Sequence, residues 1–177
     1  MISIFAVSQV LVAFALLIEG TAMQMKHKHH LLVLLSMSCL LNSIHYFLLD
    51  QATAGFIFLL SSVRFLINLR WQSFKLAALF LSVNVVVTML TYNGVLSILG
   101  LCATLFITTS GFCKDRAMRI LMIVGGLIWL IHNVILMSPI AILLELCFVI
   151  SGALGFYRHY YRSHGKPAQQ ALNSKKL

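Results

Sequence analysis

Four ionisable side chains stand out inside the apolar stretches of this sequence. They are His45, Arg64, His132 and Glu145. An ionisable side chain in hydrocarbon costs about 2.5 to 3.5 kcal/mol on insertion scales, so each of the four needs a partner or a function. Histidine gains or loses a proton near neutral pH, and arginine binds anionic groups through several N–H donors. Together these residues could bind a small polar or anionic solute and carry protons.

Neutral polar side chains and one broad aromatic side chain accompany the histidines. Asn42 precedes His45 by three positions, Trp129 precedes His132 by three, and Asn133 follows His132 directly. Their hydrogen-bonding groups would suit a small polar solute. The same residue types also hydrogen-bond between packed transmembrane helices, and for any one of them that interpretation is favoured.

Arg64 and Glu145 could offset each other's insertion penalty. Arg64 precedes Arg70 by six residues, which places it about 9 Å from the end of its helix at 1.5 Å per residue. Glu145 lies toward the opposite end of another apolar run. The two residues therefore differ in depth, but two long side chains could bridge that difference directly or through water. Alternatively, Arg64 extends to the nearer headgroups and Glu145 stays protonated. The sequence leaves both arrangements open.

His45, His132 and Glu145 lie near the same ends of their predicted helices and could share a layer. Such a layer could carry protons, hold a divalent metal or form interhelical hydrogen bonds. The hydrogen-bonding interpretation is favoured over a metal site, and we expect neither a metal nor a cofactor. The sequence contains no phosphate-binding loop, Ser-His-Asp arrangement or HExxH motif, so we do not expect an enzyme.

The elements that position these residues are helices in a membrane. The 177 residues are 60% hydrophobic and 10% charged, with a mean hydropathy of +0.97, which is too apolar for a soluble domain. Seven apolar runs approach the ~20 residues that span a bilayer, although the third and fourth are short. The runs cover residues 2–20, 31–49, 55–69, 76–91, 95–112, 117–137 and 140–157. The pattern predicts an all-α integral membrane protein with seven transmembrane helices.

The positive charges indicate how these helices are oriented. Of the 13 Lys and Arg residues, all except Arg64 follow the first, third, fifth or seventh run, and the loops around Asp50, Tyr92 and Pro139 contain none. Because Lys and Arg concentrate in cytoplasmic loops, we expect the N-terminus outside and the C-terminus in the cytoplasm. The net charge of +9 then reports topology and attraction to membrane lipid, and no nucleic-acid partner is expected.

An internal repeat relates the first three helices to the last three. Ile44-His45 and Ile131-His132 occupy equivalent places near the ends of the second and sixth runs. We therefore predict two parallel three-helix bundles, residues 1–70 and 94–162, joined by a linker helix within residues 71–93 and followed by a disordered cytoplasmic tail, residues 163–177. Parallel repeats recur in transporters whose substrate site lies between the repeats. Alternatively, the duplication only builds a stable bundle.

The segments Ile44–Leu49, Arg64–Arg70 and Trp129–Asn133, followed by Glu145, resemble the bacterial inner membrane protein YgjV family. The resemblance extends to about Arg162 and implies a bacterial inner membrane location, without an activity. More remotely, the chain is similar to the SWEET and PQ-loop transporters, which have two three-helix bundles joined by a linker helix. That similarity implies facilitated or proton-linked movement of a small solute such as a sugar, an amino acid or an organic acid.

The chain departs from the SWEET and PQ-loop pattern in its prolines. It has no Pro-Gln pair, and its two prolines are Pro139 and Pro167, so the proline hinges associated with gating in those families are absent. We expect a small-solute transporter, monomeric or homo-oligomeric, in which Arg64 recognises a polar or anionic group and Glu145 couples protons with the histidines. Alternatively, the chain is a non-transporting membrane protein that binds a protein partner or lipid, and its buried polar residues serve helix packing.

Overall fold

The computed structural model describes residues 3–22, 25, 27–71, 73–110, 113 and 115–160. These residues form seven α-helices and contain no strand, so the predicted all-α class and helix number are confirmed. The helices are α1 (Ile4–Ala22), α2 (Lys28–Leu48), α3 (Ala52–Ile67), α4 (Phe74–Leu90), α5 (Val95–Ser110), α6 (Asp115–Ile135) and α7 (Pro139–Tyr160). The predicted tail, residues 163–177, lies outside the described residues.

Several helices begin before the apolar run that predicted them. α2 and α3 each begin three residues earlier than expected, because the residues before the two apolar runs, 28–30 and 52–54, continue the helical backbone. By length and composition, three helical segments are suited to cross a membrane, namely residues 4–22, 29–48 and 116–135. The apolar parts of the other four helices, residues 52–67, 74–90, 95–110 and 139–154, are shorter.

Polarity is distributed as in a protein whose solvent is lipid. Large apolar side chains are exposed on all seven helices, including Leu17 on α1 and Leu90 on α4. The interior instead holds many serine, threonine, asparagine and histidine side chains. Some of these polar groups hydrogen-bond to carbonyls of their own helix, as Asn84 does. Others hydrogen-bond between helices, as do Ser36 and Ser62, which connect α2 to α3 through hydroxyl and carbonyl contacts of 2.9 to 3.0 Å.

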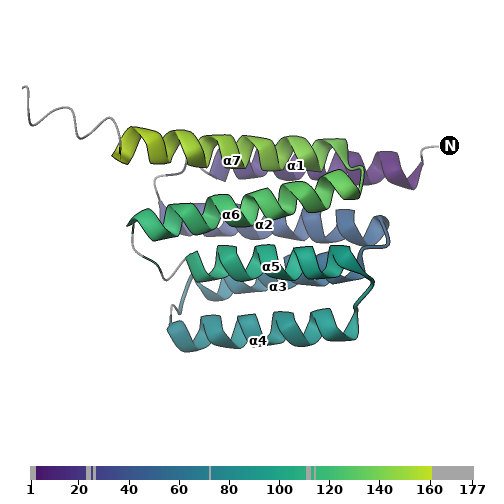
Figure 1. Cartoon of the computed structure of the whole chain (residues 1–177), viewed down its shortest axis with the longest axis horizontal. Coiled ribbons are helices and arrows are strands. Elements are labelled where there is room, and N and C mark those ends of the chain that lie inside the picture. Colours follow the sequence, from purple (N-terminus) through teal and green to yellow (C-terminus); the bar gives the residue numbers. More distant parts are fainter. Residues whose placement is uncertain are drawn as a thin grey trace, which may run out of the picture.

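The helices run side by side and alternate in direction (Figure 1). α2 packs between α1 and α3, and α6 packs between α5 and α7. α1 to α3 form one set of helices and α5 to α7 form the other. The two sets meet through contacts of α3 with α5 and of α1 with α7, and α4 packs on α3 and α5. We call the end where α1, α3, α5 and α7 finish the basic end, since Arg70, Lys75 and Arg116 lie there, and the opposite end the Asp50 end.

Two turns at the Asp50 end have the same backbone conformation. Asp50, after α2, and Met137, after α6, have φ angles of 56° and 57°, which non-glycine residues seldom adopt. In both turns the next amide donates to the carbonyl five positions earlier, at 2.9 and 3.1 Å, and so satisfies the helix C-terminus. α2 and α6 also have equal lengths of 21 residues. The two helix–turn units therefore share one geometry.

Apolar packing holds the two sets together at two places. One buried cluster joins α2, α3, α5 and α6 through residues that include Tyr46 and Trp129, and the other joins α1 to α7. Close approach of α6 to α5 depends on Gly125, where a Cβ atom would lie 2.5 Å from Cγ1 of Ile107 and 3.1 Å from the carbonyl oxygen of Ala103. The space left between the two sets lies between the two apolar clusters.

Candidate functional site

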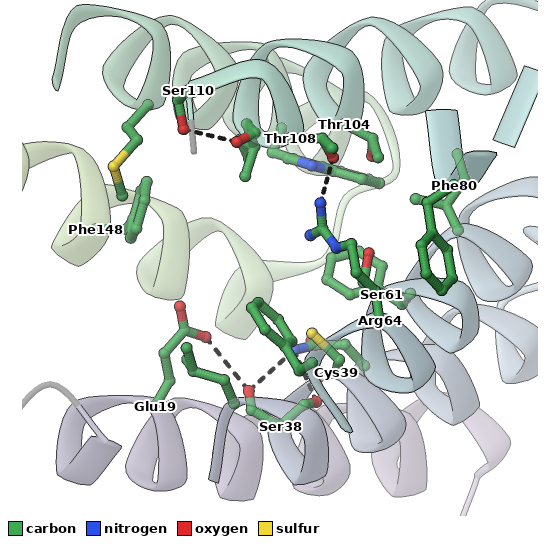
Figure 2. A pocket seen from close by; sticks show the side chains of 18 of the residues that line it. Glu19, Ser38, Cys39, Ser61, Arg64, Phe80, Thr104, Thr108, Ser110 and Phe148 are labelled. Atoms are coloured by element: carbon green, nitrogen blue, oxygen red, sulfur yellow. Dashed lines mark hydrogen bonds between the residues drawn. The ribbon is translucent and has the colours of Figure 1, made fainter. Parts of the chain in front are cut away.

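A cavity of about 530 Å³ lies between the two sets, and all seven helices contribute to its lining. Its deepest part is formed by Tyr46, Trp129 and Asn133, toward the Asp50 end. From there the lining continues to the basic end, where it includes Ser73 and Phe74, both of which are exposed. Figure 2 shows polar side chains from opposite walls pointing into this space. The lining thus extends from the aromatic residues near the Asp50 end to exposed residues at the basic end.

Arg64 extends from α3 across the cavity toward α5 (Figure 2). Its Nη1 donates a hydrogen bond to the hydroxyl of Thr108, and the guanidinium carbon lies 5.3 Å from the centre of the Phe65 ring. Its Nε atom is buried and has no partner within the described residues. The guanidinium is therefore held in place while keeping an N–H donor unused.

Glu145 reaches the cavity from α7 and is only 7% exposed. Within the described part of the chain, its carboxyl group makes no hydrogen bond, and no nitrogen of Arg64 lies within ion-pair distance of it. The direct Arg64–Glu145 pair that the sequence left open is not formed. Instead, both residues line one cavity, and Arg64 takes Thr108 as its partner, a contact that the sequence did not indicate.

Glu19 is a third ionisable residue of the cavity, and our sequence analysis missed it. It lies one turn before the end of α1, and its Oε2 accepts a hydrogen bond of 3.3 Å from the Ser38 hydroxyl (Figure 2). Glu19 and Glu145 both line the cavity. An acidic residue between Ile18 and Gly20, inside the first apolar run, was the signal that could have identified it.

His45 and His132 are fully buried, but neither lines the cavity. The Nδ1 atom of His45 lies 2.9 Å from the carbonyl oxygen of Ser8, which can only accept, so Nδ1 carries the hydrogen and donates a hydrogen bond to that carbonyl. Its Nε2 atom lies 3.3 Å from the Ser138 hydroxyl, which can donate to it. His45 therefore connects α2 to α1 and to the turn between α6 and α7.

His132 lies behind an aromatic floor formed by the rings of Tyr46, Phe58 and Trp129, whose centres are 4.9 to 5.8 Å apart. The His132 ring packs edge-on against Tyr46 at 5.6 Å and against Trp129 at 5.0 Å, and its Nε2 atom is buried without a partner in the described residues. The floor thus separates this imidazole from the cavity.

Asn133 closes the deepest part of the cavity together with the aromatic floor. Its Oδ1 atom accepts a hydrogen bond of 2.8 Å from the Tyr46 hydroxyl and lies 3.4 Å from Nδ1 of His132. Its Nδ2 atom is buried, and none of the described residues accepts a hydrogen bond from it. Asn133 is 1% exposed and lines the cavity.

Five of the seven site residues proposed from the sequence line the cavity. These are Asn42, Arg64, Trp129, Asn133 and Glu145. The two histidines belong to the wall behind it, so they do not share one solute-facing layer with Glu145. In the described part of the chain, no three His, Cys, Asp or Glu side chains gather as metal ligands would.

Hydrogen bonds close the Asp50 end. Gln9 of α1 donates from Nε2 to the Ser138 hydroxyl at 3.1 Å and accepts from the amide of Ile140 at 3.2 Å. On the other side of the bundle, the hydroxyl groups of Thr53 and Ser97 lie 2.8 Å apart and connect α3 to α5. The two sets are therefore joined beyond the floor, while the cavity extends the other way.

The fold and the site define a helical membrane protein with a polar cavity inside its bundle. The chain belongs to the Imp-YgjV family of bacterial inner membrane proteins, whose family model matches residues 6–163. Neither a curated protein nor a solved structure matches the chain. The predicted family and its association with the bacterial inner membrane are thereby confirmed.

Proposed function

We propose that this protein is a small-solute transporter built from two parallel three-helix repeats and a linker helix, α4, with a SWEET-like arrangement. The observation that carries the proposal is the cavity of about 530 Å³, which holds ionisable side chains inside an apolar bundle and whose lining reaches exposed residues at the basic end. Ligand cavities in proteins are commonly about 300 to 1,000 Å³, so this one suits a small solute.

The repeat is supported by the lining of the cavity. Tyr46 and Asn133, which are bonded to each other, are separated by 87 positions, as are Asp50 and Met137 in the two equivalent turns. Six pairs of cavity-lining residues have this separation: Leu35 and Met122, Asn42 and Trp129, Tyr46 and Asn133, Ile57 and Leu144, Phe58 and Glu145, and Ser61 and Phe148. Equivalent faces of α2 and α6, and of α3 and α7, thus surround one space.

Helix contacts also fit an approximate two-fold axis along the bundle. Such an axis exchanges α1 with α5 and α3 with α7, so it converts the α3–α5 contact into the α7–α1 contact, and both are present. Transporters with parallel repeats have this symmetry and bind substrate near the axis. The helix α4, which contacts only α3 and α5 among the described helices, has no equivalent and fits the linker.

Transport requires access from both sides of the membrane. With the basic end in the cytoplasm, as the charge distribution indicates, the cavity in this structure faces the cytoplasm and the N-terminus is periplasmic. Opening to the periplasm then requires the bonds of Gln9, His45 and Tyr46 to break at the Asp50 end. Glu145, unpartnered in the cavity, is our candidate for carrying a coupled proton, and His45 and His132 lie in the wall that must move.

The direct test is uptake and efflux by purified protein in proteoliposomes, screened over a metabolite panel with and without a pH gradient. Wild-type protein should move at least one solute, and Glu145→Gln should remove the response of the flux to the pH gradient. Asp50→Asn is the matched control, because Asp50 is exposed and outside the cavity. Absence of flux for every solute under either gradient would contradict transport.

A non-transporting role is our second candidate, since several buried polar residues do serve packing, including the Ser36–Ser62 contact and the bonds of His45. In that case Arg64→Ala and Glu145→Ala would each lower the folded yield, and the double variant would cost little more than either single one. Normal folding of the single variants together with a changed phenotype would exclude it.

A further inference from the structure

We infer that the cavity takes a small zwitterion, a solute with an anionic group and a protonated amine on one partly apolar skeleton. The inference rests on the proposed function and adds the chemical class of the solute. It depends on three features of the cavity: unused hydrogen-bond donors, two carboxyl groups, and an apolar surface.

The unused donors require an acceptor that the protein does not supply. Nε of Arg64 and Nδ2 of Asn133 are both buried, both belong to cavity-lining residues, and neither has a partner within the described residues. Buried polar groups in folded proteins almost always have partners. A carboxylate or another anionic group of a solute offers the acceptor oxygens that a guanidinium binds best.

The carboxyl groups of Glu19 and Glu145 argue against a solute that carries only negative charge. Among the described residues, the cavity lining holds these two acidic side chains and a single basic one, Arg64. A purely anionic solute would add to the acidic excess inside a low-dielectric bundle, where like charges repel strongly. A protonated amine on the same solute gives Glu145, which has no hydrogen-bond partner among the described residues, a donor and a counter-charge.

Much of the remaining lining is apolar and aromatic, alongside hydroxyl and amide side chains such as Ser61 and Asn68. Ile57 and Leu144 lie near the aromatic floor of Tyr46, Phe58 and Trp129. Such a surface excludes water and suits an aliphatic or aromatic skeleton, and aromatic faces also attract ammonium groups. A sugar, which carries hydroxyl groups on all sides and no charge, would leave Arg64 and the carboxyl groups without counter-charges.

Matched solutes with one skeleton test the charge requirement. Purified protein in lipid nanodiscs is titrated with leucine, with 4-methylpentanoate, which lacks the amine, and with 3-methylbutylamine, which lacks the carboxylate. Phenylalanine, with 3-phenylpropanoate and 2-phenylethylamine, provides a second series, and glucose is the neutral comparison. In at least one series the zwitterion should bind about tenfold more tightly, or better, than either singly charged relative. Equal or tighter binding of an acid, an amine or glucose, or no binding of either zwitterion, overturns the inference.

Two variants test which side chain binds the anionic group of the solute and which binds its amine. Arg64→Gln should reduce affinity for the zwitterion to that of the amine, and Glu145→Gln should reduce it to that of the acid. Lys75→Gln and Asp50→Asn, both exposed and outside the cavity, should leave affinity unchanged. If a cavity variant does not fold, the comparison of solutes on wild-type protein still decides the question. Binding without flux would contradict transport alone, whereas flux of a sugar or a purely anionic solute would contradict the zwitterion alone.

Discussion

The Tyr46 hydroxyl donates a 2.8 Å hydrogen bond to Oδ1 of Asn133, and the two residues are separated by 87 positions along the chain. This bond spans from α2 to α6, the central helices of the two sets, whose backbones do not approach each other closely. It therefore joins the two sets at the deepest part of the cavity. The bond therefore contributes to the stability of the bundle and helps to close the Asp50 end.

Tyr46→Phe tests this bond. The substitution removes the donor, leaves Oδ1 of buried Asn133 without its best partner, and should lower the free energy of unfolding by about 1 to 3 kcal/mol. Thermal unfolding of the detergent-solubilised protein measures the change. Tyr92→Phe, at an exposed position beyond α4, is the matched control and should have little effect. Equal stability of the two variants would mean that the bond contributes nothing.

Arg64 provides a test that separates binding from packing. If its charge serves a ligand, Arg64→Met removes a costly buried charge at similar volume, so stability should stay the same or rise while solute binding is lost. Thr108→Val, which takes a hydrogen-bond acceptor from the guanidinium, should instead reduce the free energy of unfolding by about 1.5 to 3 kcal/mol. A fall in melting temperature for Arg64→Met as large as that for Thr108→Val would favour a packing role.

Glycine at position 125 should be essential for the close contact of α6 with α5. An alanine Cβ there would meet the Ile107 side chain and the Ala103 carbonyl, so Gly125→Ala should lower stability by about 1 to 3 kcal/mol. Gly20→Ala places its Cβ where no atom lies within 4 Å and should be neutral or slightly stabilising, because alanine favours helix. Melting temperatures of the two variants in the same detergent provide the comparison.

The orientation of the bundle can be measured with single cysteines. In a variant whose four native cysteines are replaced by serine, Asp50→Cys should react with a membrane-impermeant thiol reagent added to spheroplasts, and Lys75→Cys should react only in inverted vesicles. The reason is that Lys and Arg are retained in cytoplasmic loops. The reverse pattern would invert the proposed topology, and labelling of both residues from one side would contradict the alternating helices.

Cys39 reports on the closed end from inside the cavity, which it lines. With the other three cysteines replaced, Cys39 should react with a small impermeant reagent from the basic end and be protected from the Asp50 end. Gln9→Ala combined with Ser138→Ala removes bonds that join α1 to the turn before α7, so labelling from the Asp50 end should increase. Unchanged protection in the double variant would show that these bonds do not hold the end closed.

Some of this description could be predicted from residue order alone. The seven helices follow from the spacing of apolar runs, because a backbone in lipid must satisfy its own hydrogen bonds and a helix does so locally. The match between Ile44-His45 and Ile131-His132, which supports the proposed repeat, was visible in the sequence. The five predicted residues that line the cavity were recognised because polar groups in apolar helices are costly. These features depend on composition and local spacing.

The contacts across the bundle could not be predicted in this way. Arg64 pairs with Thr108 and not with Glu145, and the histidines lie behind the aromatic floor although Trp129 and Asn133, their neighbours in sequence, face the cavity. Glu19 was missed because its position near a helix end resembles that of an ordinary interfacial residue.

The sequence by itself determined the class of protein, its seven helices and the rarity of the charges within them. Only the tertiary structure decided which of those charges share a cavity and which hydrogen bonds close one end of it. The physical reason is that the rotation of each helix about its axis, which selects the side chains that meet, is set by packing between helices far apart in the chain, as at Gly125 and Ile107.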